Sequence, residues 1–218
     1  MRKNVSLGIA KGLAFLHEEA EPHIVHRDIK PGNIVLDRNF IPKISDFGLS
    51  KLFISNASHI STRVAGTLGY LAPEYAITGH LTRKSDVYSY GILLLQIVSG
   101  RSVMEFNTER GETYLADEAW DLYKENNILH LVDPTLSGRF LEKEAVLFLK
   151  VGLLCLQGTA TIRPQMSTVA KMLANEININ DIAISKPGSL SALSNLKGHS
   201  TFSKSSSSTG SASYPTNI

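Results

Sequence analysis

The spacing of apolar positions predicts a body made mostly of helices. Residues 87–98 are apolar on almost every side, which is typical of a helix buried in the middle of its domain. The other expected helices carry a single apolar stripe or lie at the surface. They cover about residues 3–18, with Val5, Ile9, Leu13 and Leu16 on one face; 114–125, as an exposed helix; the stretch with Val146, Leu149, Leu153 and Leu156; and the stretch with Met166, Val169, Ala170 and Leu173.

Short apolar pieces lie among turn residues near the start of the chain. They cover residues 24–25, 34–36 and 43–45, and they predict small strands. Residues 46–74 and 101–113 are polar and show no clear periodicity, so we interpret both as loops. A structureless stretch as long as 46–74 inside a compact domain is usually functional.

The composition changes after about residue 180. Residues 185–218 are dominated by Ser, Gly, Asn and Thr, and they include four consecutive serines at 205–208. Such a segment buries too little apolar surface to offset the entropy of ordering it. We therefore expect a folded domain over residues 1–180 and a serine-rich disordered tail over 181–218.

Composition and charge are those of an ordinary globular domain. Of the 218 residues, 43% are hydrophobic and 19% charged, which allows one domain with a real core. A net charge of +2 does not indicate a nucleic-acid or membrane surface. No apolar run approaches the roughly 20 residues that span a bilayer. The single cysteine, Cys155, excludes an internal disulfide and favours a reducing compartment; we interpret it as a small core residue.

Three sequence blocks carry the candidate chemistry. The first is His-Arg-Asp-Ile-Lys-Pro-Gly-Asn at residues 26–33, the second Asp-Phe-Gly at 46–48, and the third Ala-Pro-Glu at 72–74. Each block is weak evidence alone, but all three in this order resemble the eukaryotic protein kinase family, whose catalytic loop reads H-R-D-x-x-x-x-N. The resemblance covers roughly residues 3–175.

Longer phrases are similar to those of plant receptor-like serine/threonine kinases. They are Gly-Leu-Ala-Phe-Leu-His at 12–17, Gly-Thr-Leu-Gly-Tyr-Leu-Ala-Pro-Glu-Tyr at 66–75, Leu-Val-Asp-Pro at 131–134 and Arg-Pro at 163–164. The resemblance implies the C-terminal lobe of a kinase, a mostly α fold with a few short β-strands.

The resemblance also assigns roles to five side chains. Asp28 would orient or accept the proton of a substrate hydroxyl, and Lys30 would contact the transferring phosphate, as in serine/threonine kinases. Asn33 and Asp46 would supply oxygen ligands to Mg²⁺, the partner of ATP. Val35 would lie beneath adenine. The alternatives are a solvated surface lysine at position 30 and a plain core valine at position 35.

Other implied roles concern the segment between Asp46 and Glu74, which we call the activation segment. Arg27 would grip a phosphate on this segment. The candidate phosphosites are Ser58, Ser61 and Thr62, with ordinary loop hydroxyls as the alternative. Thr67 matches a family threonine that contacts the catalytic loop, so we do not expect it to be the first phosphosite.

Further residues have expected structural roles. Ser85 and Asp86 precede the central helix, where both side chains can cap free N–H groups. Asp86 also resembles a buried aspartate that holds the backbone of the catalytic loop. Glu74 and Arg163 resemble an ion pair that joins the activation segment to the late helices, with two unrelated surface charges as the alternative. His26 and Phe47 would belong to a hydrophobic stack.

The sequence motifs with which the N-terminal lobe of kinases binds ATP do not occur in these 218 residues. No G-x-G occurs among the 16 glycines, and no Gly-Lys dipeptide occurs. We therefore expect the N-terminal lobe to be absent from this chain, either because the chain is truncated or because Met1 is a misplaced start.

Two functions from different classes follow from these observations. The first is a serine/threonine protein kinase that transfers the γ-phosphate of ATP to protein hydroxyls but is weakly active as this chain alone. The second is a non-catalytic, kinase-like binding or scaffold fragment in signalling. The expected partners are protein substrates, with a membrane receptor or an upstream kinase, and neither nucleic acid nor direct membrane insertion. The expected place is the cytoplasm, including the inner face of the plasma membrane through partners.

Overall fold

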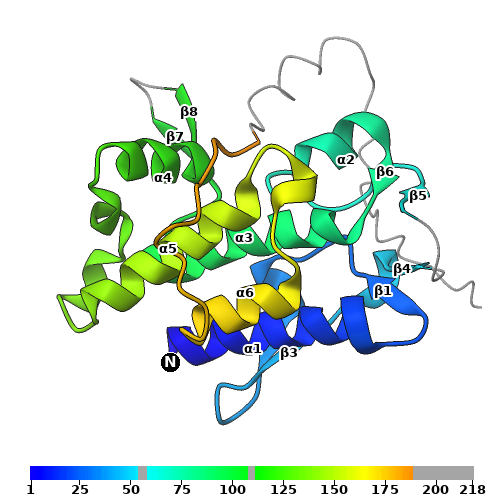
Figure 1. Ribbon diagram of the computed structural model, residues 1–218, viewed down its shortest axis with the longest axis horizontal. Coiled ribbons are helices and arrows are strands. Elements are labelled where there is room, and N and C mark those ends of the chain that lie inside the picture. Colours follow the sequence, from blue (N-terminus) through cyan, green and yellow to red (C-terminus); the bar gives the residue numbers. More distant parts are fainter. Residues whose placement is uncertain (54–57, 108–110, 189–218) are drawn as a thin grey trace, which may run out of the picture.

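A computed structural model describes residues 1–53, 58–107 and 111–188 (Figure 1). Six α-helices are described: α1 (Arg2–Ala14), α2 (Pro73–Thr78), α3 (Arg83–Ser99), α4 (Leu115–Lys124), α5 (Glu142–Leu156) and α6 (Met166–Leu173). A π-helical turn, η1 (Phe15–Glu19), continues α1. The described 3-10 turns are η2 (Pro31–Asn33), η3 (Phe47–Leu49), η4 (Ile128–Leu131), η5 (Pro134–Leu136) and η6 (Ala160–Ile162).

The described strands form four separate antiparallel pairs. The pairs are β1 (His23–Val25) with β4 (Lys51–Phe53), β2 (Ile34–Leu36) with β3 (Pro42–Ile44), β5 (Ile60–Ser61) with β6 (His80–Leu81), and β7 (Met104–Asn107) with β8 (Gly111–Tyr114). Each pair is too small to form a core of its own. The strands therefore serve mainly to fix loops against the helical body.

Helix α3 is the centre of the molecule. Every residue from 85 to 95 is buried, which confirms the prediction of a helix enclosed on almost every side. It packs against α5, while α1 lies beside α6 (Figure 1). A Cβ added at Gly91 would lie 2.9 Å from the Cβ of Cys155 on α5, so the glycine permits this close approach. Cys155 itself is fully buried among apolar neighbours, as expected.

Two stretches that we interpreted as loops contain strands. Residues 104–107 and 111–114 form the antiparallel pair β7–β8, and the activation segment contains β4 and β5. The prediction failed because these strands are two to four residues long, too short to show a period. Moreover, β4 and β5 pair with β1 and β6, and such distant partners leave no local signal in the sequence.

The folded body extends past the boundary predicted at residue 180. The amide of Gly188 donates to the carbonyl of Leu156 at 2.9 Å, and the amide of Gly158 donates to the carbonyl of Lys186 at 3.1 Å. Residues 185–188 are therefore held against the end of α5, and we call them the C-terminal strap. The rest of the predicted tail, 189–218, lies outside the described residues.

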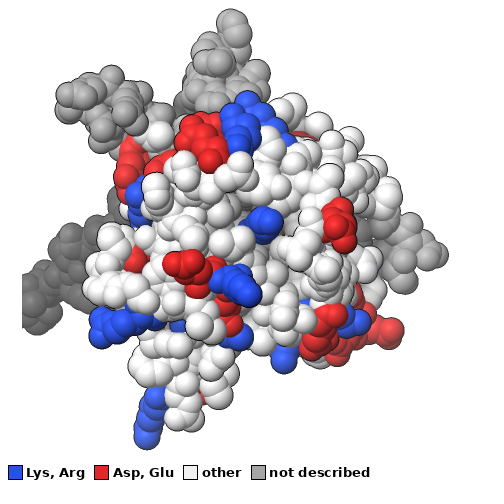
Figure 2. Space-filling view, turned by 60° about the vertical axis from the view of Figure 1, so that its left-hand side comes forward, with Lys and Arg blue, Asp and Glu red and all other residues white. Residues whose placement is uncertain are grey.

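The hydropathy of the helices and the charge of the surface bear on binding to membranes and to charged partners. No helix among the described residues combines the length and hydropathy needed to cross a bilayer. On the face shown in Figure 2, basic and acidic side chains are interspersed instead of gathering by sign. This face therefore presents no extended field of one charge.

Candidate active site

The backbone of the catalytic loop (26–33) is held by a carboxylate from the central helix. Asp86 is fully buried and accepts hydrogen bonds from the amides of His26 at 2.7 Å and Arg27 at 2.8 Å. Its Oδ2 also lies 2.9 Å from Nε2 of His17. The expected helix-capping role goes to Ser85 alone, whose Oγ accepts from the amide of Thr82, because the oxygens of Asp86 are engaged by the loop.

Two of the candidate residues have a left-handed backbone. Arg27 has φ 73° and Asp46 has φ 61°. This region is uncommon for residues other than glycine and costs free energy unless the surroundings impose it. At Arg27 the hydrogen bonds to Asp86 impose it; at Asp46 the side chain accepts from the amide of Gly48 at 3.3 Å. Strained backbone thus occurs in both motifs that carry the candidate catalytic residues, at 26–33 and at 46–48.

Asp28 lies at the centre of a small polar cluster. Its carboxylate is almost buried, with 6% of the residue exposed. It receives hydrogen bonds from the hydroxyl of Thr67 at 2.6 Å, from the amide of Asn33 at 3.0 Å, and an ion pair with Lys30 at 2.7 Å. Lys30 also donates to Thr67 at 2.8 Å. Lys30 is therefore not a free surface lysine, and a hydroxyl already lies against the carboxylate.

These contacts decide the charge of Asp28. Burial by itself would raise the pKa of the carboxyl, but hydrogen bonds from Lys30, Thr67 and Asn33 and the positive charge of Lys30 outweigh it. The net effect is a pKa below the ordinary value of 3.8. The group is accordingly ionised at neutral pH and able to accept a hydrogen bond from a hydroxyl.

The β2–β3 hairpin brings Asn33 and Asp46 to the same end of the site. The amide of Ser45 donates to the carbonyl of Asn33 at 2.9 Å, and Ser45 immediately precedes Asp46. The side-chain nitrogen of Asn33 is committed to the carbonyl and the carboxylate of Asp28, which turns its oxygen away from Asp28. Asp46 is exposed. Asn33 and Asp46 thus start from neighbouring backbone positions, and each carries a side-chain oxygen, the type of ligand that suits a hard cation.

Arg27 binds the activation segment directly in this structure. Its guanidinium donates to the carbonyls of Leu49 at 3.0 Å and Arg63 at 2.7 Å and to the hydroxyl of Tyr75 at 2.7 Å. Close by, a Cβ at Gly66, whose φ is 130°, would lie 2.6 Å from the carbonyl of Arg27. The segment is thereby held against the catalytic loop. A phosphate as a partner of Arg27 stays a prediction.

The predicted pair of Glu74 and Arg163 is joined by two parallel hydrogen bonds. The distances are 2.7 and 2.8 Å, a bidentate geometry that adds specificity as well as energy. Arg163 is 1% exposed, and its guanidinium lies over the ring of Tyr88 at 5.0 Å. The two charges are therefore not unrelated surface groups.

The remaining candidates lie at the surface or at its edge. Ser58 and Ser61 are exposed and Thr62 is half-buried. Val35 is 53% exposed on β2, so the alternative of a plain core valine is wrong. The ring of Phe47 meets that of His26 edge to face, with the centroids 5.0 Å apart.

Some residues of the site had no signal in the sequence. His17 bonds Asp86, Tyr75 bonds Arg27, and Gln157 bonds Arg163 through its carbonyl at 2.8 Å. His17 and Tyr75 lie 69 and 48 residues from these partners, whereas Gln157 lies only six residues from Arg163. Only the fold shows these pairings, although a buried polar residue generally needs a partner.

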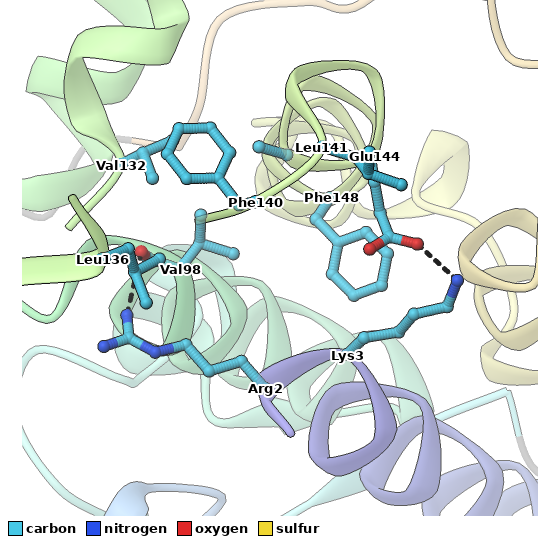
Figure 3. Close-up of a pocket in the computed structure, with 10 residues that line it drawn as sticks. Arg2, Lys3, Val98, Val132, Leu136, Phe140, Leu141, Glu144 and Phe148 are labelled. Carbon is cyan, nitrogen blue, oxygen red and sulfur yellow. Dashed lines mark hydrogen bonds and ion pairs between the residues drawn. The ribbon is translucent and has the colours of Figure 1, made fainter. Parts of the chain in front are cut away.

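An apolar hollow lies away from the motifs, at the start of α1 and α5 (Figure 3). Val98, Phe140 and Phe148 are among its walls. At its rim, Arg2 pairs with Asp133 and Lys3 pairs with Glu144. A second cavity, beside η1 and the start of α3, is lined by Arg83, Lys84 and other residues. Neither cavity contains a residue of the catalytic loop.

The sequence of this chain is similar to those of known protein kinases. The protein kinase domain family matches residues 1–171. The chain is 54% identical over 196 residues to Cold-responsive protein kinase 1 of Arabidopsis thaliana, covering 90% of this chain and 50% of that protein. It is 48% identical over 190 residues to a probable LRR receptor-like serine/threonine-protein kinase of the same plant, covering 87% and 18%. A second such receptor-like kinase is 51% identical over 178 residues, covering 82% and 17%.

The chain belongs to the protein kinase family. Its relatives named above are plant kinases, two of them receptor-like, as the sequence motifs indicated. The chain spans half or less of the length of these relatives.

Proposed function

We propose that this chain is the catalytic lobe of a serine/threonine protein kinase that transfers the γ-phosphoryl group of ATP to protein hydroxyls. The observation that carries the proposal is the cluster around Asp28, in which an ionised carboxylate, Lys30 and a bound hydroxyl lie within 2.6 to 2.8 Å of one another. Phosphoryl transfer is largely positioning and charge neutralisation, and this cluster supplies both.

In this proposal, Asp28 orients the substrate hydroxyl and accepts its proton. Thr67 shows that a hydroxyl fits against the Oδ1 of Asp28 at 2.6 Å. Lys30 keeps the carboxylate ionised and places a positive charge where the transferred group gains negative charge. Asn33 positions the carboxylate through its hydrogen bond to Oδ2.

Asn33 and Asp46 would hold a divalent cation, and we propose Mg²⁺. The backbone bond from Ser45 to Asn33 keeps the two residues near each other, and the described residues offer no cluster of three or more His, Cys, Asp or Glu that could hold a metal without them. Mg²⁺ is usually bound by one or two protein oxygens, with phosphate oxygens and water completing the shell. A bound Mg²⁺–ATP would supply the phosphoryl group. Val35 on β2, the strand that follows Asn33, is exposed, and we propose that it contacts the adenine base.

The lobe assignment and the partners belong to the same proposal. The β2–β3 hairpin exposes four large apolar side chains, more than a stable surface hairpin needs; they are Val35, Leu36, Phe40 and Ile41. We propose that an N-terminal kinase lobe covers this surface and that the 218-residue chain alone is weakly active. The proposed partners are protein substrates and an upstream kinase or receptor, in the cytoplasm or at the inner face of the plasma membrane.

The test is a phosphotransfer assay with Mg²⁺–ATP and a mixed serine/threonine peptide library. It compares Asp28→Asn with the parent, both as the 218 residues alone and fused behind the preceding segment of the 54% identical relative. We expect the fused parent to be the more active, and Asp28→Asn to lower its rate by about 100-fold or more. Asp121→Asn, at an exposed position on α4, is the matched control and should leave the rate unchanged.

The opposite result is equally informative. If the fused parent and Asp28→Asn incorporate phosphate at the same rate, the cluster is not catalytic. The chain would then be a binding module.

A further inference from the structure

The C-terminal strap (185–188) ends on the residues that anchor the activation segment. The hydroxyl of Tyr88 on α3 donates to the carbonyl of Gly188 at 2.9 Å. Tyr88 is fully buried, and burial raises the pKa of its hydroxyl, which therefore stays a donor. On its other side, a Cβ added at Gly188 would lie 3.0 Å from the ring of Pro73. The strap thus contacts both the central helix and the first residue of α2.

A second connection runs through Gln157. Both the amide and the hydroxyl of Ser185 donate to its side-chain oxygen, at 3.2 and 3.0 Å. Gln157 is 3% exposed. Its side-chain nitrogen donates to the carbonyl of Ile162 at 3.2 Å, and its backbone carbonyl accepts from Nε of Arg163 at 2.8 Å. These hydrogen bonds fix the position of Ser185 relative to Arg163, because the loss of any one of them would leave a buried polar atom without a partner.

The two connections meet at the ion pair of Glu74 and Arg163. The ring of Tyr88 lies beneath the guanidinium of Arg163, and Gln157 holds the same guanidinium from the side. The carboxylate of Glu74 accepts hydrogen bonds from both terminal nitrogens of this guanidinium. The strap therefore braces the ion pair through two independent routes, although 114 residues of sequence separate Glu74 from Gly188.

We propose that the strap is an intrachain clamp that positions the end of the activation segment, and that Tyr88, Gln157 and Ser185 are its positioning residues. Residues 66–72, which include the Thr67 that bonds Asp28, lead directly into Pro73 and Glu74. When the strap leaves, the ion pair loses its brace and this stretch becomes more mobile. The effect on substrate rests on the proposed kinase function, whereas the effect on mobility does not.

The experiment compares Tyr88→Phe with Tyr90→Phe in the full chain. Both tyrosines are fully buried on α3, and each hydroxyl donates to one backbone carbonyl; that of Tyr90 reaches Ser6 on α1 at 3.0 Å. The two variants thus lose the same kind of hydrogen bond, but only Tyr88→Phe releases the strap. Amide hydrogen exchange is followed in peptides covering 64–72 and 184–188.

We expect Tyr88→Phe to speed exchange in both peptides by about three- to tenfold, the loss of one hydrogen bond. Tyr90→Phe should leave these two peptides unchanged. Equal exchange of 64–72 in the two variants would refute the clamp. Fused behind the relative's preceding segment, Tyr88→Phe should also raise KM for the peptide substrate by about threefold with KM for ATP unchanged. A chain without any phosphotransfer refutes the kinase function while the exchange result still decides the clamp.

A pair of truncations checks the same point without touching the core. A chain that ends at residue 184 lacks the strap, and one that ends at residue 188 keeps it; both lack 189–218. Exchange of 64–72 should be faster by at least about threefold in the shorter chain. Identical exchange in the two chains would again refute the clamp.

Discussion

Asp28 and Asp46, the two aspartates that the motifs identified, differ in how far they are exposed to solvent. Asp28 is almost buried, and its loop is fixed from behind by the fully buried Asp86. Asp46 is exposed, and its described side-chain hydrogen bond comes only from its own turn. The half of the site that we propose to act on the hydroxyl is thus held by contacts within the described residues. The half that we propose to hold the metal and nucleotide has fewer such contacts.

The largest expected effect comes from removing the buried support. In Asp86→Ala, the amides of His26 and Arg27 and the ring of His17 lose their acceptor inside the core. We expect the free energy of unfolding to fall by about 3–5 kcal/mol, the range for breaking a buried charged interaction. Urea unfolding measures it, and a loss below about 1 kcal/mol would contradict the view that this half is self-contained.

The open half should respond in the reverse way. Asp46→Asn keeps a residue that tolerates the left-handed backbone and can still accept from Gly48. Its free energy of unfolding should therefore change by no more than about 0.5 kcal/mol. The phosphotransfer rate of the fused chain should nevertheless fall by about 100-fold, because the carboxylate that we propose as a metal ligand becomes neutral. A large loss of stability in the urea titration would show that Asp46 is structural.

The smallest effect concerns pH. Because the pKa of Asp28 is lowered, its ionised form persists as pH falls and is lost only below about 3.8, the unperturbed value. Between pH 5 and 8 its carboxyl carbon should therefore show no titration step by NMR. Lys30→Met removes a hydrogen bond and a positive charge, which shifts the step upward in pH. An unchanged step in this variant would mean that Lys30 does not hold the charge of Asp28.

Much of the fold followed from the pattern of apolar residues, because α1, α5 and α6 bury stripes that repeat every three or four residues and α3 is apolar on almost every side. The candidate chemistry followed from the blocks around Asp28 and Asp46, since those residue types are needed together. The strap did not follow: its residues are polar, and backbone hydrogen bonds to Leu156 and Gly158 hold it, which composition does not reveal. The same holds for His17 and Tyr75, whose partners Asp86 and Arg27 are far away in the sequence, and for the hydrogen bond from Ser185 to Gln157.

The contacts of Arg27 have one more consequence. Its single planar group ties together three separate stretches of chain, at Leu49, at Arg63 and at Tyr75 on α2. A lysine has one nitrogen, which cannot span three acceptors that point along different directions. Replacing Arg27 with lysine would therefore break most of the hydrogen bonds that hold these three stretches to the catalytic loop, although the net charge of the protein would stay the same.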